Sequence, residues 1–345
     1  MRRFILAVLL VGLWVGLAIS PIAQESSDIV RVPEDASTIQ AAIDEVAEGG
    51  TILISAGTWT GNLVVEKRLI LRGVGGHSDD VQIKAAGQGC PVILIRGLNP
   101  DSQVQLENLT ITGASIGSCR EDLSDATVGD GVGVLGNVNV IVSNVAISGN
   151  QNDGLHAQDA ATVTVVNSRI ADNGDTGLLA LDEAVVDVFT SEIANNEAHG
   201  LGTSSSGDVR VFGSTLTDHG ENGVIAIFSA SVHIAGSRLV SNDGHGLYLR
   251  GMSLGKIFDT EIDNNTANGV YLEDEAEIEL YANRIEGNQN VGLLTHSADC
   301  VDELMAAAEF NGTISGSANR VADNASGDVC PESLSFLTDV VSSEK

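Results

Sequence analysis

Hydrophobic and polar positions along the chain repeat with a period of 23 residues. Eight glycines keep this spacing: Gly131, Gly154, Gly177, Gly200, Gly223, Gly246, Gly269 and Gly292. A Val or Leu follows each glycine, and further aliphatic rows stand nine, eleven and sixteen residues after it. Around these rows apolar and polar residues alternate with a period of two, which is typical of β-strands. The pattern therefore predicts three short strands in every 23 residues.

Three such strands make one turn of a parallel coil, with successive turns stacked about 4.8 Å apart. Only inward side chains and turn residues must match their neighbours above and below, so outward positions are free to vary. Composition agrees with this interpretation, because aromatic residues are 3% of the chain and glycines number 39. Such a chain suits thin layers of small aliphatic side chains joined by tight turns.

A row of polar residues follows the last strand of each repeat. Its members are Asn150, Asn173, Asn196, Asn242, Asn265 and Asn288, with His219 in the remaining position. An asparagine in a stacked turn can bond backbone groups of the neighbouring coil and its own neighbours in the row. We interpret this row as structural. A smaller row is interpreted in the same way: Ser168, Ser191, Ser214, Ser237 and Thr260.

The stretch STIQAAIDEVAEGG near the start has helical periodicity. Its apolar face consists of Ile39, Ala42, Ile43 and Val46. Ser37 or Thr38 would start this helix, and Gly49 and Gly50 would stop it. The helix would cover the apolar end of the first coil, which would otherwise be open to water and to edge pairing. We therefore expect an N-terminal cap segment over residues 28–50.

The asparagine row, the three-strand coil and the opening STIQAAIDEVAEGGTILISAGTWTGNLVVEKRLILRG resemble the right-handed parallel β-helix proteins of the pectate lyase-like (pectin lyase-like) superfamily. The opening is similar to the start of pectin methylesterases. The resemblance covers roughly residues 30–330 and implies an all-β right-handed parallel β-helix of about 10–12 coils with an N-terminal capping helix. It implies less about activity, because the superfamily contains lyases, hydrolases, esterases, epimerases and proteins with no known chemistry.

Two coils depart from the period. Val104 matches Val140 and Ile285 matches Val321, each at a distance of 36 residues. The excess predicts side loops at about residues 114–129 and 296–312 of a β-helix over residues 51–330, with a C-terminal cap or tail over residues 331–345. In the β-helices of this family, long side loops form the walls of clefts, so the two loops are candidates for a functional role. Simple tolerance of insertions is the alternative.

At the N-terminus, Arg2 and Arg3 precede an apolar run from Phe4 to Ile19. This pattern is typical of a secretory signal peptide, here over residues 1–23. The alternative is an uncleaved membrane anchor, although the run is short for a span of about 20 residues. No later segment could cross a bilayer, so no stable membrane span is expected after signal removal. The expected location is secreted, periplasmic or at the cell surface.

The formal net charge is −30. Nucleic acid is therefore not expected as a partner, and bare polyanionic sugars would be repelled unless calcium bridged the two surfaces. The acidity would equally suit a salt-rich habitat. Four cysteines in an exported chain suggest two disulfides with three possible connectivities. We prefer the local pairs, Cys90 with Cys119 and Cys300 with Cys330.

The candidate chemistry lies ten residues after each glycine, on the outer face of the middle strand. This row contains Thr164, Asp187, Arg210, His233, Lys256 and Glu279. In pectate lyases a sheet's outer face holds calcium-binding carboxylates, a basic residue that abstracts a proton and the sugar-binding groove. The catalytic candidates are therefore Arg210, His233 and Lys256. The proposed ligand-binding face comprises Asp187, Phe189, Asp208, Arg210, Phe212, His233, Lys256, Phe258, Glu279 and Tyr281.

The same row has a plainer interpretation as alternating surface ion pairs, each worth about 0 to 1 kcal/mol. The aromatic residues would then cover a strand edge, although a stacked aromatic strip is also what a sugar ring packs against. A second outward surface could serve as a docking patch or as an ordinary exposed sheet face: Ile225, Ile227, Tyr248, Arg250, Tyr271, Leu294 and His296.

The sequence GHG at Gly244–Gly246 resembles a polygalacturonase motif. The preceding coil offers Glu221 and Asn222 where those hydrolases need paired aspartates, and RIE at Arg284 replaces their RIK. We interpret the motif as accidental. The pectin methylesterase signatures that should follow the opening are absent in usable context. No zinc-ligand spacing, serine elbow or phosphate loop is found.

The favoured hypothesis is an exported β-helix repeat protein that binds a polysaccharide or cell-surface glycan without cleaving it. The first alternative is a calcium-dependent polysaccharide lyase or uronate epimerase that uses the Asp187 to Glu279 row. The second is a structural surface or adhesion protein that docks through Tyr248 and Tyr271. No cofactor is indicated except calcium, which the enzyme alternative would need. The sequence specifies neither the glycan nor an oligomeric state.

Overall fold

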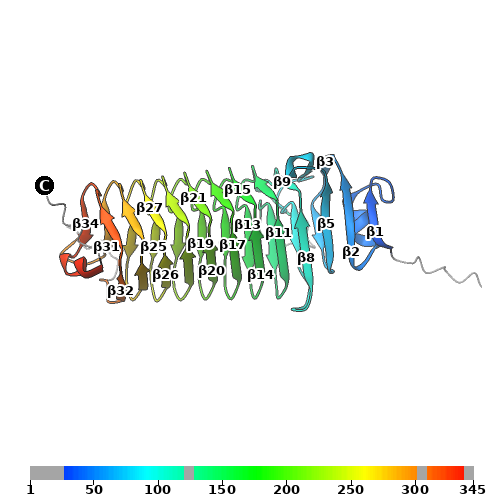
Figure 1. Cartoon of the computed structure of the whole chain (residues 1–345). Helices are drawn as coiled ribbons and strands as arrows, with labels where there is room; N and C mark the ends of the chain where they lie inside the picture. Colours follow the sequence, from blue (N-terminus) through cyan, green and yellow to red (C-terminus); the bar gives the residue numbers. More distant parts are fainter. Residues whose placement is uncertain (1–26, 120–127, 301–308, 338–345) are drawn as a thin grey trace, which may run out of the picture.

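The computed structural model describes residues 27–119, 128–300 and 309–337. Parallel strands pair from coil to coil in three sheets that run along the molecule (Figure 1). The chain is an all-β right-handed parallel β-helix of about 11 coils, as the sequence predicts. No helix among the described residues is long and apolar enough to span a membrane.

Sheet A takes the middle strand of each repeat. Its twelve strands are β1 (Ser27–Val32), β2 (Val46–Ser55), β5 (Leu69–Val74), β8 (Gln103–Glu107), β11 (Asn139–Ser143), β14 (Thr162–Val166), β17 (Val185–Phe189), β20 (Asp208–Phe212), β23 (Ser231–Ala235), β26 (Leu254–Phe258), β29 (Glu277–Tyr281) and β32 (Thr313–Ser317).

Sheet B follows sheet A in each coil. Its eleven strands are β3 (Gly57–Thr60), β6 (Val81–Lys84), β9 (Thr110–Thr112), β12 (Ala146–Ser148), β15 (Arg169–Ala171), β18 (Glu192–Ala194), β21 (Thr215–Thr217), β24 (Arg238–Val240), β27 (Glu261–Asp263), β30 (Arg284–Glu286) and β33 (Arg320–Ala322).

Sheet C closes the coil. Its eleven strands are β4 (Leu63–Val65), β7 (Ile93–Ile95), β10 (Val132–Leu135), β13 (Leu155–Gln158), β16 (Leu178–Ala180), β19 (Leu201–Thr203), β22 (Val224–Ala226), β25 (Leu247–Leu249), β28 (Val270–Leu272), β31 (Val291–Thr295) and β34 (Gly327–Cys330).

The register follows the sequence period. Val186 of β17 pairs with Val209 of β20, one repeat away, and the two irregular coils pair at a distance of 36 residues, as Ile278 does with Ile314. Inward aliphatic side chains of all three sheets form one continuous buried core. Because every coil presents the same inward positions, apolar surface is buried along the whole length of the stack.

At the turns, three rows of polar side chains accept hydrogen bonds from backbone N–H groups of the neighbouring coil. In the asparagine ladder, between sheets B and C, Asn173 donates through its backbone N–H and through Nδ2 to Oδ1 of Asn196, at 3.1 and 2.9 Å. His219 occupies one rung, where its Nδ1 accepts from the backbone N–H of Asn196 at 3.2 Å. In the serine ladder, between sheets A and B, Ser191 Oγ accepts from the backbone N–H of Ser168 at 3.1 Å.

The first coil is covered by helix α1 (Ile39–Glu45), which begins after Thr38. Ile39, Ala42 and Ile43 are buried against the coil. The helix ends earlier than the sequence suggested. Val46 has extended backbone angles and begins β2. Gly49 and Gly50 lie inside that long strand, so they are not the residues that stop the helix. A 3₁₀ segment, η1 (Ser78–Asp80), lies beside the early coils. At the other end of the stack a second 3₁₀ segment, η3 (Glu332–Leu337), follows β34, and its Leu337 is buried.

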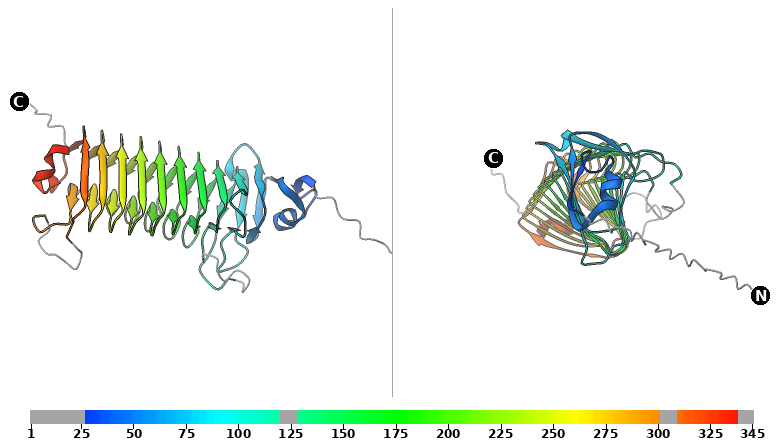
Figure 2. Two further views of the ribbon diagram at one scale, coloured as in Figure 1. Left: turned by 90° about the horizontal axis from the view of Figure 1, so that it is seen from below. Right: turned by 90° about the vertical axis from the view of Figure 1, so that its right-hand side faces the viewer.

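Both side loops adjoin sheet C. The first lies between β9 and β10 and is tied to the coil by a Cys90–Cys119 disulfide. The second leaves β31 and returns to β32, and Cys300 pairs with Cys330. In the left view of Figure 2 the two loops leave the coil on the same side. Residues 120–127 and 301–308, including Val301 of the predicted inward row, lie outside the described part of the chain, as do residues 1–26.

Candidate functional site

The predicted ligand-binding row lies on the outer face of sheet A. Val186 and Val188 of β17 are buried, whereas Asp187 and Phe189 between and beside them face outward. The same alternation holds in β20, β23, β26 and β29. All ten residues of the row therefore share one face.

Five aromatic rings form an unbroken strip along this face. Phe189 stacks on Phe212 with 5.3 Å between ring centroids, and Phe258 stacks on Tyr281 at 5.5 Å. The gap between these pairs is filled by His233, whose ring meets Phe212 and Phe258 edge-on at 5.3 and 5.5 Å. Ala235 occupies the strand position at which the other coils carry a ring. Four coil steps make the strip about 19 Å long.

Charged side chains alternate beside the strip. Arg210 Nε lies 2.9 Å from Asp187 Oδ1 and 3.5 Å from Asp208 Oδ2, and Lys256 Nζ lies 3.4 Å from Glu279 Oε1. Burial raises the pKa of Asp187, Arg210 opposes that rise, and the neighbouring carboxylate of Asp208 adds to it. The face therefore offers donors and acceptors of both signs along one side of the aromatic strip.

The described parts of the two side loops leave the coil from sheets B and C, and the expectation that the loops wall this row stays a prediction. The first loop leads from sheet B into sheet C, and the second joins sheet A only at β32. The strip from Phe189 to Tyr281 is an elongated surface that runs along the stack. An extended polymer could lie along such a face across several coils.

A second polar cluster lies on the outer face of sheet C. Tyr248 OH donates to Glu273 Oε2 at 2.6 Å, and Tyr271 OH lies 2.7 Å from His296 Nδ1. Arg250 Nε lies 3.4 Å from Glu273 Oε2. The two tyrosine rings stack at 5.3 Å between centroids. The cluster joins phenol, carboxylate, imidazole and guanidinium groups from three consecutive coils.

Burial shapes this cluster. Glu273 and His296 are almost wholly buried, and His296 Nε2 has no hydrogen-bond partner among the residues that the structure describes. Burial, together with the Glu273 carboxylate, raises the pKa of Tyr248 and of Tyr271. The expected docking patch on this sheet is therefore smaller than the sequence suggested, because Leu294 and His296 are buried. Glu273, which connects the cluster, was not singled out by the sequence.

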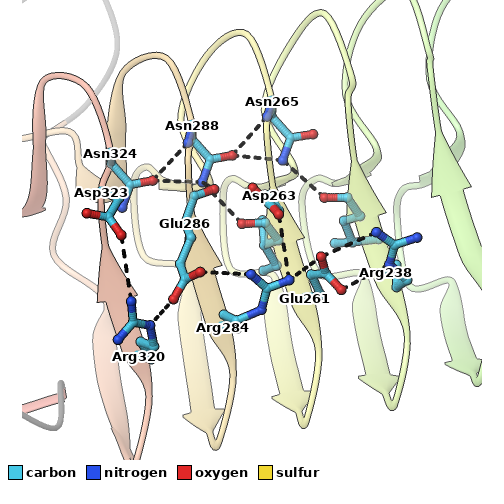
Figure 3. A network of polar contacts seen from close by, with 12 residues as sticks. Arg238, Glu261, Asp263, Asn265, Arg284, Glu286, Asn288, Arg320, Asp323 and Asn324 are labelled. Atoms are coloured by element: carbon cyan, nitrogen blue, oxygen red, sulfur yellow. Dashed lines mark hydrogen bonds and ion pairs between the residues drawn. The ribbon is translucent and has the colours of Figure 1, made fainter. Parts of the chain in front are cut away.

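Sheet B carries an ion network near the C-terminal end. Arg284 lies between Glu261 and Glu286, and Arg238 and Arg320 extend the network in both directions (Figure 3). The hydrogen bond from Arg238 lowers the pKa of Glu261. A shallow hollow of about 390 Å³ lies over Arg238, Glu261 and Arg284. Each of these arginines pairs with carboxylates of the network, so the positive charges are balanced within it.

A third ladder explains the GHG sequence. Residues immediately before the repeat glycines accept backbone hydrogen bonds from the next coil: Asp130, Asp153, His199, Asn222, His245 and Asn268. His245 Nδ1 accepts from the N–H of Asn268 at 3.1 Å. Burial lowers the pKa of His245 to about 4, which keeps this acceptor nitrogen unprotonated. His245 thus has a structural role in the ladder.

Among the described residues, one group of three potential metal ligands converges. Asp130, Asp153 and His156 are all buried, and His156 Nδ1 lies 3.6 and 3.4 Å from the two carboxylates. Burial opposes protonation of His156, but Asp153 and Asp130 outweigh it and raise its pKa. Calcium takes six to eight oxygen ligands, which this group does not supply. The calcium expectation therefore rests on the resemblance alone.

The fold and its ladders define a right-handed parallel β-helix protein, and the sequence comparison identifies its family. The profile of the family "Right handed beta helix region" matches residues 95–187 and 167–303, and the chain belongs to this family. No curated protein matches the chain in sequence.

Several solved structures share the fold. The A-module of Azotobacter vinelandii mannuronan C-5 epimerase AlgE4 is 17% identical, with 89% of this chain and 98% of that chain covered and a TM-score of 0.56. The AlgE6 A-module is also 17% identical, with 84% and 92% covered and a TM-score of 0.58. A mutant of the periplasmic alginate epimerase AlgG is 14% identical, with 88% and 81% covered and a TM-score of 0.56. At these identities the likeness is one of fold.

Proposed function

We propose that this protein is an exported β-helix that binds a polysaccharide or cell-surface glycan along the outer face of sheet A. The carrying observation is the unbroken strip of five rings from Phe189 to Tyr281. Sugar rings present apolar faces that pack on aromatic side chains. Hydroxyl groups along the edges of the polymer would bond Arg210, Asp187 and Lys256 beside the strip.

Export is supported by two observations. The structure contains two disulfides, and disulfides persist in oxidising compartments. The signal segment over residues 1–23, which precedes the described residues, is the other support. We infer the domain plan given by the sequence: signal peptide, cap segment over residues 28–50, β-helix over residues 51–330 and a C-terminal cap or tail over residues 331–345. The similar AlgG is named as a periplasmic epimerase.

The test is a binding titration with alginate, polygalacturonate and neutral glycans. Phe212→Ala should weaken binding of the glycan about fivefold or more, because it removes a ring that contacts both Phe189 and His233 in the strip. Thr164→Ala, on the same outward row one coil before the strip, is the matched control. Equal loss in both variants, or no binding by the wild type to any of these glycans, would contradict the proposal.

A second candidate function is a polysaccharide lyase or uronate epimerase, and the sheet C cluster favours it. Phenol and imidazole groups that already share short hydrogen bonds with a carboxylate or with each other can transfer protons. The epimerases of similar fold act on mannuronan and alginate by name. Arg210, His233 and Lys256 remain the candidates on sheet A, although Arg210 and Lys256 are engaged in ion pairs.

Ultraviolet absorbance of unsaturated products, measured with and without calcium, tests for lyase activity. Uptake of deuterium at sugar carbons in heavy water tests for epimerisation, which absorbance does not detect. Activity lost in Tyr271→Phe but kept in Arg210→Ala would assign it to sheet C, and the reverse would assign it to sheet A. Absence of both signals on a polymer that binds would leave binding as the function.

A further inference from the structure

The turn from sheet C to sheet A contains one residue with a positive φ in six successive coils. Along the stack this left-handed position is occupied by Asp159, Asp182, Ser205, Phe228, Gly251 and Asp274. Aspartate, serine and glycine tolerate this conformation better than bulky side chains do. Phe228, at φ 62°, is therefore the exception in the row.

Phe228 gains no packing that would explain its place there. Its exposed fraction is 63%, and Met252, at the next turn, is exposed at 62%. An aromatic residue in a disfavoured backbone conformation with a mostly exposed ring carries backbone strain that little burial offsets. Such outliers cluster at binding sites, where the strain is part of the function.

A hollow of about 280 Å³ lies beside this ring. It is lined by Ile227, Phe228, Arg250, Gly251 and Asp274. Gly251 contributes only backbone to the row between Phe228 and Asp274, and a Cβ there would come within 2.9 Å of the Phe228 carbonyl oxygen. Gly251 thus lets the two turns approach closely, and the hollow lies between an aromatic ring on one coil and a carboxylate two coils further on.

The charge around the hollow is negative. Asp274 lines it, and a neighbouring hollow of about 400 Å³ adds Glu275 and Glu309 beside Met252. Among the described lining residues the one cation is Arg250, which already pairs with Asp274 at 3.3 Å and with Glu273 at 3.4 Å. The Gly251 N–H also donates to Asp274 Oδ2 at 3.2 Å, so this carboxylate is held at the edge of the hollow.

We propose that this turn is a second binding site, separate from the aromatic strip, for a cationic amino sugar such as a glucosamine unit of a polymer. The sugar ring would pack on Phe228, and its ammonium group would lie against Asp274 and Glu275. An ammonium beside both an aromatic face and carboxylates is stabilised by cation–π attraction and by ion pairing. Uronates would meet the same carboxylates unfavourably, so the site discriminates by charge.

The site does not depend on the function proposed for sheet A. None of its lining residues belongs to the strip from Phe189 to Tyr281, and the two surfaces take different ligands. Phe212→Ala should therefore leave amino-sugar binding unchanged. Failure at one surface and failure at the other are distinguishable by this variant.

The experiment titrates the full chain with a glucosamine trisaccharide, followed by NMR or calorimetry below the pKa of the sugar amines. Phe228→Ala and Asp274→Asn should each weaken binding about fivefold or more. Asp182→Asn is the matched control, because Asp182 occupies the same left-handed position two coils before Phe228. Circular dichroism checks that each variant is folded.

Two further probes decide the chemistry. The N-acetylated trisaccharide, which has the same rings without charge, should bind more weakly than the amine. Trilysine, which has charge without rings, should not compete at comparable concentration. Equal binding of either probe would overturn the amino-sugar assignment. Equal loss in Asp182→Asn and Asp274→Asn, or no binding by the wild type, would overturn the site itself.

Discussion

The imidazole of His233 meets the ring of Phe212 edge-on, with 5.3 Å between ring centroids. The contact joins two stacked aromatic pairs that lie on different coils, so His233 completes the strip. A ligand that spans the strip needs this junction, whereas a ligand confined to one pair does not.

His233→Ala should therefore weaken binding of a long oligosaccharide more than binding of a short one. The expected loss is about 1 kcal/mol for the long ligand, typical of one aromatic contact. His233→Phe keeps a ring at the junction and should retain most of the affinity. Calorimetric titrations with oligosaccharides of increasing length measure both variants. A loss that does not depend on ligand length would argue against a continuous binding strip.

The side chain of Asn196 ties its own coil to the preceding one. Its Nδ2 lies 3.3 Å from the Ile170 carbonyl oxygen, and its Oδ1 accepts from Asn173. Asn196→Ala should lower the free energy of unfolding by about 1 to 3 kcal/mol for each buried group left without a partner. Glu192→Ala, an exposed position in the same coil, is the control and should cost under about 1 kcal/mol. Urea unfolding of the two variants decides whether the ladder stabilises the stack, and equal midpoints would speak against it.

The sequence could predict the coil because its period is repeated many times. Each inward position is specified by its neighbours as well as by itself, so even Gly255 in the row of valines does not obscure it. The residues on the outward face of sheet A could be predicted by counting positions from the repeat glycines. His233 was placed on that face, but its contact with the rings depends on side-chain direction, since Ala235 interrupts the aromatic row.

The sheet C cluster was harder to predict for a physical reason. Tyr248 bonds Glu273 across 25 residues, which is one repeat plus a step of two along the strand. A search for equal spacings finds rows that run straight along the stack and misses such diagonals. The third ladder was missed differently, because Asp153 and His245 look unlike although both supply a hydrogen-bond acceptor. The end of α1 was predicted too late, because Val46 belongs to strand β2 and local helix propensity did not indicate this.

The histidines in the ladders should make stability depend on pH. Burial lowers the pKa of His219 and of His245 to about 4 in the folded chain, whereas an unfolded histidine titrates near pH 6.5. Above pH 6.5 both states are neutral and the stability is complete. As the pH falls from 6.5 towards 4 the unfolded chain binds protons that the folded chain does not, so stability declines by up to about 3 kcal/mol for each histidine.

His219→Asn should remove its share of this decline, because asparagine fills the same rung elsewhere and does not titrate. Urea unfolding of wild type and variant at several pH values measures the difference. The raised pKa of His156 acts in the opposite direction, since its contribution is lost as the pH rises through the folded value. Because both proteins carry His156, the comparison cancels it. Parallel pH curves for the two proteins would contradict the buried state of His219.

Phe228→Gly should make the protein more stable, although it deletes a large apolar side chain. Glycine adopts positive φ without the clash that a Cβ introduces, which is worth about 1 kcal/mol, and an exposed ring contributes little burial. Phe228→Ala keeps the Cβ and should not gain, so it separates backbone strain from loss of the ring. Thermal unfolding without ligand measures both variants. A higher melting temperature for Phe228→Gly, with amino-sugar binding lost, would mean that the chain keeps a destabilising residue at this turn for its ring, whereas a lower one would mean that the ring contributes to packing.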